Sequence, residues 1–168
     1  MVAAARNETD SAPREATIDL PSDRETVITR VFDAPASLVW KAMTTPEHIK
    51  RWYGLRSLET TIAEYDPRPG GKWRFVQRAP DGEEYAFSGV IREVDPPNRV
   101  VNTEQFEAMP GTEYVVTTTF VEKDGKTTMT SHMRYQSREH RDGHLQSGME
   151  SGMNETFQRL DEVLATLA

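Results

Sequence analysis

Several side chains in this sequence could carry out catalysis or bind a metal, but their spacing fits no established site. His140 and His144 lie one helical turn apart, yet a catalytic zinc site needs a third ligand, and the His-Glu-x-x-His pattern is missing. We therefore expect both on a solvated helix face, with no metal bound. His132 falls in an expected strand, where alternation could direct its ring inward as a structural or titratable residue.

Two glycine-containing segments also lack the features of a reactive site. Ser147 and Ser151 each precede a glycine, but they lie in a helical pattern without the strand-to-helix turn that exposes a hydrolase serine. Gly70-Gly71-Lys72 has no following Ser or Thr and precedes a strand, unlike a phosphate-binding loop. The chain has no cysteine, which excludes a thiolate nucleophile. We expect no cofactor, and the catalytic residues, if any, are unknown.

Large aromatic residues and one end of the last helix form the best candidate for a binding site. Interior aromatics can build a solid core or the wall of a cavity. Gly148 and Gly152 each cost a helix about 1 kcal/mol relative to alanine. They could allow a close helix approach, leave room for a guest, or mark a kink or helix start. The expected ligand-binding residues are Trp52, Tyr53, Trp73, Phe75, Phe87, Phe106, His132, Met149, Gly152, Met153 and Phe157.

Length and composition indicate one intracellular domain. The 168 residues are enough to bury a core without disulfides. Since no apolar run approaches the roughly 20 residues of a membrane helix and no signal peptide is visible, we expect a cytoplasmic protein without a membrane span. The net charge of -7, from 20 basic and 27 acidic residues without a basic cluster, argues against nucleic acid as a partner.

The elements that must position the aromatic residues are mostly strands. Residues 1–23 contain few large apolar side chains and are expected to form a mobile tail, in which 17–20 could add a short edge strand. The domain proper is expected over 24–168 and begins with a strand from Glu25. Turn signals then separate further strands, expected at 60–66, 72–79, 84–94, 99–107, 112–122 and 127–136.

Helices are expected on both sides of this meander. Pro35 and the Thr45-Pro46 pair each mark the start of a short helix, the first carrying Trp40 in a structural role. From Leu145 to Leu167, apolar residues recur in steps of three and four, which predicts one continuous helix after a turn capped by Ser137. Such a helix can bury its apolar stripe against the concave face of a curved antiparallel sheet. The predicted fold class is α+β.

Ordered motifs along most of the chain add a family resemblance. They include Arg30-Val31-Phe32-Asp33-Ala34-Pro35, Thr45-Pro46-Glu47-His48, Arg68-Pro69-Gly70-Gly71 with Trp73, Pro96-Pro97 with Arg99, and Ser147-Gly148-Met149-Glu150 with Arg159-Leu160. From about Leu20 onward the chain resembles the bacterial relatives of the activator of heat-shock protein 90 ATPase, in the START-like or SRPBCC superfamily of helix-grip folds. One difference is local: many relatives have Trp-Trp-Gly-Pro where this chain has Trp52-Tyr53-Gly54-Leu55.

The resemblance implies a sheet wrapped around the C-terminal helix, with an apolar cavity roofed by the two short helices. It implies binding of a small hydrophobic or aromatic molecule, lipids included, and we expect a binding protein rather than an enzyme. The second hypothesis is a cyclase, dehydratase or hydrolase that uses His132, Tyr53 or an inward carboxylate as general acid or base. The third hypothesis is a protein that acts with a chaperone in the stress response. This hypothesis is weakened because that activator resembles a two-domain protein, whereas this chain is too short for an added chaperone-binding domain. A homodimer is left open.

Overall fold

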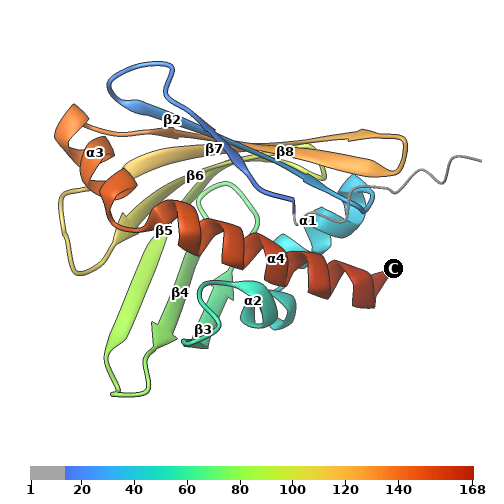
Figure 1. The fold of residues 1–168 in the computed structure, drawn as a ribbon, viewed down its shortest axis with the longest axis horizontal. Helices are drawn as coiled ribbons and strands as arrows, with labels where there is room; N and C mark the ends of the chain where they lie inside the picture. The colour runs from blue at the N-terminus through green and yellow to red at the C-terminus, as the bar shows by residue number, and fades with distance from the viewer. Residues whose placement is uncertain (1–13) are drawn as a thin grey trace, which may run out of the picture.

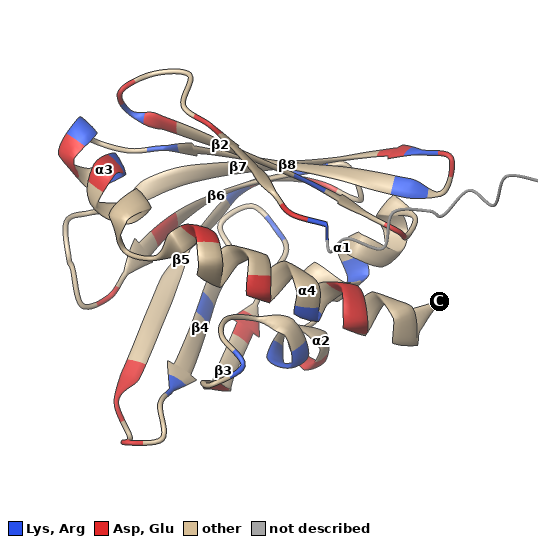
Figure 2. Ribbon diagram, viewed as in Figure 1, with Lys and Arg blue, Asp and Glu red and all other residues tan. Residues whose placement is uncertain are grey.

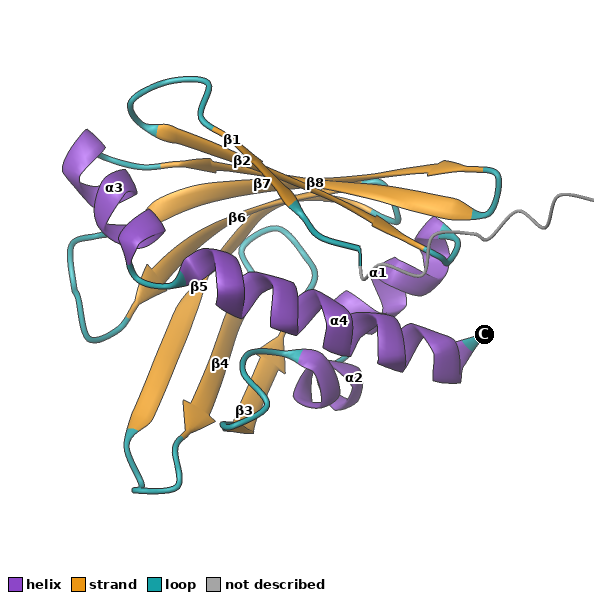
Figure 3. Ribbon diagram, viewed as in Figure 1, coloured by secondary structure: helices purple, strands orange, loops and turns teal. Residues whose placement is uncertain are grey.

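Eight antiparallel strands form one curved sheet in the computed structural model, which describes residues 14–168 (Figures 1 and 3). The strand order is β1-β2-β8-β7-β6-β5-β4-β3, so the first two strands lie beside the last, and the rest form a meander. The strands are β1 (Thr17–Asp19), β2 (Glu25–Phe32), β3 (Glu59–Tyr65), β4 (Lys72–Arg78), β5 (Glu84–Asp95), β6 (Arg99–Phe106), β7 (Tyr114–Lys123) and β8 (Lys126–Arg134).

Four helices complete the α+β helix-grip fold that the sequence predicted. They are α1 (Ala36–Thr44), α2 (Pro46–Trp52), α3 (Arg138–Gln146) and α4 (Met149–Leu167). Helix α4 runs along the concave side of the sheet, with α1 and α2 near its C-terminal half (Figure 1). Its closest backbone neighbours are the other three helices rather than any strand. Side chains therefore have to fill whatever space remains between α4 and the sheet.

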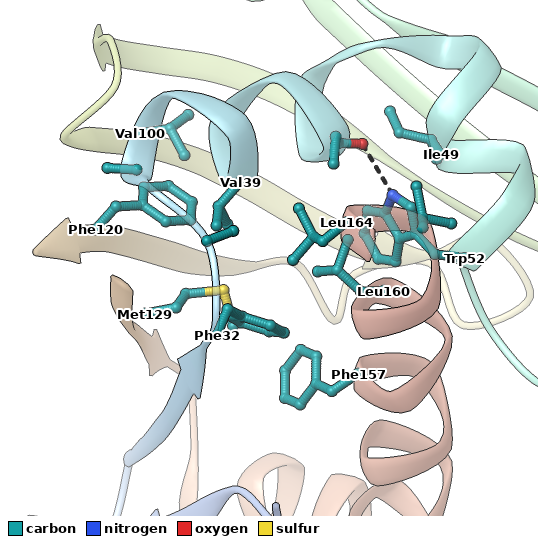
Figure 4. Close-up of a cluster of buried hydrophobic side chains, with 14 of the residues drawn as sticks. Phe32, Val39, Ile49, Trp52, Val100, Phe120, Met129, Phe157, Leu160 and Leu164 are labelled. Carbon is teal, nitrogen blue, oxygen red and sulfur yellow. Dashed lines mark hydrogen bonds between the residues drawn. The ribbon is translucent and has the colours of Figure 1, made fainter. Parts of the chain in front are cut away.

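The main apolar core lies between the sheet and the C-terminal half of α4 (Figure 4). Phe32 of β2 and Phe157 of α4 meet edge to face, with ring centroids 5.7 Å apart. Trp52, at the end of α2, is buried, and its indole nitrogen donates to the carbonyl of Ala42 at 2.9 Å. A buried indole needs such a partner, and this bond fixes α2 against α1. Trp40 packs edge to face on Phe120, which agrees with its predicted structural role.

A second, smaller cluster lies at the far end of the sheet. It consists of Tyr114, Val116 and Tyr135, with the partly exposed Met133 packed against it. Met133 also contacts the main core, so it lies where the two clusters adjoin. The concave face thus has two packed regions that meet at the partly exposed Met133.

One predicted element is wrong: the helix expected to run without interruption from Leu145 to Leu167 is divided. Helix α3 ends at Gln146, and α4 begins at Met149 after Gly148, whose φ of 84° places it in the left-handed region. Glycine enters that region without a steric penalty. Of the three explanations for Gly148, the helix start is therefore the one observed. The predicted cap at Ser137 is confirmed, because its hydroxyl accepts from the amide of His140 at 3.1 Å.

The short edge strand expected at 17–20 is present as β1, which pairs antiparallel with β2. The Ala16 amide donates to the side chain of Asn154 in α4 at 3.1 Å, and Arg30 of β2 forms an ion pair with Asp161 at 2.5 Å. Residues 14–23, predicted as part of a mobile tail, therefore include a strand of the sheet. Residues 1–13 of that predicted tail lie outside the described residues. Within 14–168, no helix is both long enough and apolar enough to cross a bilayer.

Candidate functional site

A row of aromatic side chains crosses the concave face from the end of α2 to β6. Tyr53 meets Phe75 edge to face, with centroids 4.8 Å apart. The register of β4 and β5 places Phe75 opposite Phe87. Phe87 in turn stacks on Phe106 of β6, with ring centroids 4.9 Å apart. Trp73 adds a further ring 4.9 Å from Phe75. The structure thus brings together five of the residues that the sequence proposed as ligand-binding.

Trp73 is fixed by an unusually close passage across β5. Its indole nitrogen donates to the carbonyl of Thr103 in β6 at 3.0 Å. Between them lies Gly89, where an added Cβ would be 1.8 Å from that carbonyl oxygen and 2.6 Å from the indole nitrogen. Only glycine fits here, because any side chain would collide with backbone on the neighbouring strand. Gly89 therefore determines where the Trp73 ring lies.

The position of Tyr53 is set by hydrogen bonds to its backbone carbonyl. That oxygen accepts from Thr60 and Gln77 at 3.1 Å each, and from Arg159 of α4 at 3.0 Å. The next residue, Gly54, has φ 77°, and a Cβ there would lie 2.0 Å from the Gln77 amide. Three separate elements thus hold the start of this loop, which leaves the Tyr53 ring in a defined place on the concave face.

Glu104 is a further residue of this region that was not predicted from the sequence. In the register of β6 and β7 it lies opposite Tyr114, whose phenol donates a hydrogen bond to its carboxylate. Burial raises the pKa of Glu104, with the Tyr114 hydrogen bond opposing that change. Burial, together with the charge of Glu104, also raises the pKa of Tyr53. The alternation of Val100, Asn102 and Glu104 with outward residues could have revealed it, once β6 was assigned.

Several of these side chains are surrounded by protein and still keep some solvent access. Burial is the main cause of the raised pKa of both Tyr53 and Glu104, although neither side chain is fully buried. The same partial exposure is found for neighbours at the edge of the main core. We call this set the interior site: Tyr53, Phe87, Glu104, Phe106, Met133, Met149 and Met153.

Met149 and Met153 contribute the α4 side of the interior site, and both pack against the main core while remaining partly exposed. Gly152 lies beside them, and a Cβ there would meet only Leu55, at an ordinary 3.6 Å. A close helix approach therefore does not explain this glycine. Trp52 and Phe157, also proposed as ligand-binding, are buried members of the core.

His140 and His144 do not lie on a solvated helix face, which corrects the prediction. Both rings pack on the Tyr114–Tyr135 pair, with centroid separations of 5.1 to 5.7 Å. The Tyr135 hydroxyl and His144 Nδ1 are 2.5 Å apart. Burial, with a smaller contribution from His140, lowers the pKa of His144 to about 4, so its ring is neutral near pH 7. Among residues 14–168, no three His, Cys, Asp or Glu side chains gather as a metal site would require.

His132 also lies elsewhere than predicted. In the pairing of β2 and β8 it is opposite Val27, whereas Ile28, a core residue, is opposite Ser131. Because neighbours in register point to the same face, His132 projects from the outer face of the sheet. Its ring nitrogen lies 2.7 Å from the carboxylate of Glu25 there. The strand was predicted correctly, but the side assigned to His132 was wrong.

Comparison with known proteins identifies a family and a set of similar folds. Residues 33–165 match the family model for activator of Hsp90 ATPase homolog 1-like protein. A crystal structure from Rhodobacter sphaeroides has a TM-score of 0.86 and 28% identity, covering 90% of this chain and 99% of that chain. Protein Ms6760 from Mycobacterium smegmatis has a TM-score of 0.79 and 28% identity, covering 90% and 97%.

CalU16 from Micromonospora echinospora shares the fold at a TM-score of 0.58 and 22% identity, over 90% of this chain and 84% of that chain. No curated protein matches the sequence significantly.

Proposed function

The chain belongs to the family of activator of Hsp90 ATPase homolog 1-like proteins, and we propose that it binds a small apolar or aromatic molecule at the interior site. The observation that carries this proposal is the incomplete burial of rings on the concave face of the sheet. Close-packed interiors leave few voids, so large side chains there are normally sealed from water. Tyr53, Phe87 and Phe106 are instead accessible in part.

The two ends of α4 support the same proposal. The C-terminal half packs through Phe157, Leu160 and Leu164, all of which are buried. The N-terminal half carries Met149 and Met153, whose unbranched side chains adapt to irregular partners. A ligand site needs such a combination of a rigid apolar wall and a few polar groups. Here the aromatic row supplies the wall, and Glu104 and the Tyr53 phenol supply the polar groups.

Uptake of the neutral fluorescent probe N-phenyl-1-naphthylamine tests this function. The parent protein should bind the probe and enhance its emission. Gly152→Leu should weaken binding by about tenfold or more, because its side chain extends beyond the Cβ position toward the loop at Leu55 and its methionine neighbours.

The matched control is Gly143→Leu, since Gly143 is an exposed helical glycine of α3 with no atom near its Cβ position. It should leave probe binding unchanged. Thermal unfolding of both variants separates loss of the site from loss of the fold. The proposal is wrong if the parent takes up no probe, or if both leucine variants bind it as the parent does.

Glu104 favours a second candidate, a reaction at the same site. A buried carboxyl group with a raised pKa, hydrogen-bonded to a phenol, has the properties of a general acid or base. Native mass spectrometry of protein purified from its own host distinguishes the two functions. A binding protein retains and releases one unchanged molecule, whereas an enzyme converts the molecule it retains into a second species on incubation. For both candidate functions we propose a cytoplasmic location.

A further inference from the structure

Glu104 lacks a positively charged partner in the part of the chain that the structure describes. Its carboxylate takes part in none of the ion pairs of residues 14–168, and its hydrogen-bond partner there is the phenol of Tyr114. The titratable side chains that respond to its charge are Tyr53, Tyr114 and Tyr135, all of them phenols. A phenol can donate a hydrogen bond, but it brings no positive charge. One carboxylate oxygen therefore remains for another donor.

Other carboxylates on neighbouring strands behave differently. Glu107, just beyond the end of β6, pairs with Arg74 of β4 at 2.9 Å, and Glu93 of β5 pairs with Arg99. Both of these acidic side chains are on accessible surface, where an ion pair is easily made and easily replaced by water. Glu104 instead lies partly buried on the concave face, opposite Tyr114, and a carboxylate shielded from water is costly unless it is neutralised or paired.

The surroundings of Glu104 suit an organic cation. The indole nitrogen of Trp73 donates to the carbonyl of Thr103, the residue that precedes Glu104. Phe106 lies two residues after Glu104 in the same strand. Faces of aromatic rings attract cations, an effect that strengthens when the pair is shielded from water. The net charge of -7 adds a long-range attraction for positively charged molecules. Figure 2 shows Lys and Arg spread among Asp and Glu over helices, strands and turns, α2 and α4 included.

From this arrangement we infer that the interior site selects an apolar or aromatic molecule that carries a protonated amine, with Glu104 as its counter-ion. The inference rests on the proposed binding function and adds to it the chemical class of the ligand. The ammonium group donates to the carboxylate oxygen that Tyr114 leaves free, and the apolar body lies along the row of Phe87, Phe106 and Tyr53.

Two naphthalene probes of the same size test the inference at pH 7.5. They are 1-naphthylmethylamine, which is protonated, and 1-naphthylmethanol, which is neutral, and their dissociation constants are measured by calorimetry. The parent protein should bind the amine at least about tenfold more tightly, the scale of a hydrogen bond to a charged group. Glu104→Gln keeps an oxygen that can accept from Tyr114 but removes the charge. It should reduce the difference between the probes to within about threefold, with the affinity for the alcohol unchanged.

Glu107→Gln is the matched control, since it removes an accessible carboxylate three residues away, and it should retain the full preference for the amine. Glu104→Asp keeps the charge but withdraws it by one methylene, so its preference should be intermediate. This second variant keeps the test decisive if Glu104→Gln fails to fold.

Equal binding of both probes by the parent, or an unchanged amine preference in Glu104→Gln, would overturn the inference while leaving the binding function intact. If the parent binds neither probe, the inference and the proposed function both fail. A preference that is lost equally in Glu107→Gln would show a general surface attraction and would also overturn the role of Glu104.

Discussion

Side chains at and beside the interior site are positioned by glycines that lie outside it. Gly89 lets the Trp73 indole cross β5, and Gly54 leaves room for the Gln77 amide that holds the Tyr53 carbonyl. These glycines are conformational or steric requirements of the scaffold, because a Cβ at either position would overlap another group. A substitution at such a position should alter the site without removing any group that contacts the ligand.

His144 makes the stability of the fold depend on pH. Its folded-state pKa is lowered to about 4, whereas an unfolded chain has the ordinary value near 6.5. The unfolded state therefore binds more protons between these values, and the stability of the fold falls as the pH drops through this window.

We expect that His144→Gln loses less stability than the parent on going from pH 7.5 to pH 5, by about 1 to 2 kcal/mol. Urea unfolding at the two pH values measures this difference. His48→Gln is the control, because His48 belongs to α2 and lies outside the Tyr114–Tyr135 cluster. A parent and a His144→Gln variant with the same pH dependence would mean that the ring is not held neutral by its surroundings.

At the scale of elements, Arg159 joins α4 to the loop that follows α2. Its guanidinium donates to the carbonyls of Tyr53 and Gly54 at 3.0 and 2.9 Å, and to that of Arg51 at 3.0 Å. These carbonyls include ones that the end of α2 leaves without a helical partner. Burial lowers the pKa of Arg159, but a guanidinium stays charged at neutral pH. Arg159 thus helps to hold α4 against the Tyr53 loop, together with Glu155 and Glu162, which both accept from Arg56.

Arg159→Leu should lower the free energy of unfolding by about 2 kcal/mol, since it leaves several carbonyls without a charged donor. It should also weaken uptake of the neutral probe, because Tyr53 is no longer held. Arg51→Leu removes a nearby exposed arginine whose side chain donates to the hydroxyl of Thr166, and it should change both quantities little. Chemical denaturation and probe titration provide the two readouts. Similar losses in both variants would count against a specific role for Arg159.

The boundaries of the strands could be predicted because their signals are local. Asp81-Gly82 and Asp124-Gly125 mark hairpin turns, and both glycines have positive φ, as the turn chemistry requires. The division between α3 and α4 was not predicted, because it depends on one residue that the hydrophobic period does not reveal. The apolar spacing from Leu145 to Met153 continues across Gly148, and periodicity does not register a single left-handed residue.

At the scale of the whole molecule, the site depends on how the sheet curves and pairs. Alternation predicted that Phe75, Phe87 and Phe106 share a face, and the register confirms it. The face of His132 could not be predicted, since a one-residue change of phase reverses every side chain of a strand. The pairing of Glu104 with Tyr114 likewise depends on the β6–β7 register, which requires the structure.

The concave face carries two packed regions, each beside different helices. The main core gathers beside α1, α2 and the C-terminal half of α4, and the smaller cluster lies under α3. Met133 contacts both, and Met149 and Met153 flank the main core from α4. The methyl groups of Met133, Met149 and Met153 therefore report on the interior site, whereas Met109 is exposed on a turn and Met43 belongs to α1.

Binding of a small apolar molecule between the sheet and the N-terminal half of α4 can be detected by NMR of methyl-labelled methionines. Naphthylmethanol is added to the labelled protein until binding is saturated, and each methyl resonance is assigned by single Met→Leu variants. Binding at this place should give the largest shifts at Met133, Met149 and Met153, with Met43 and Met109 unchanged. Largest shifts at Met109 or Met43, or no methyl shift at saturating probe, would contradict it.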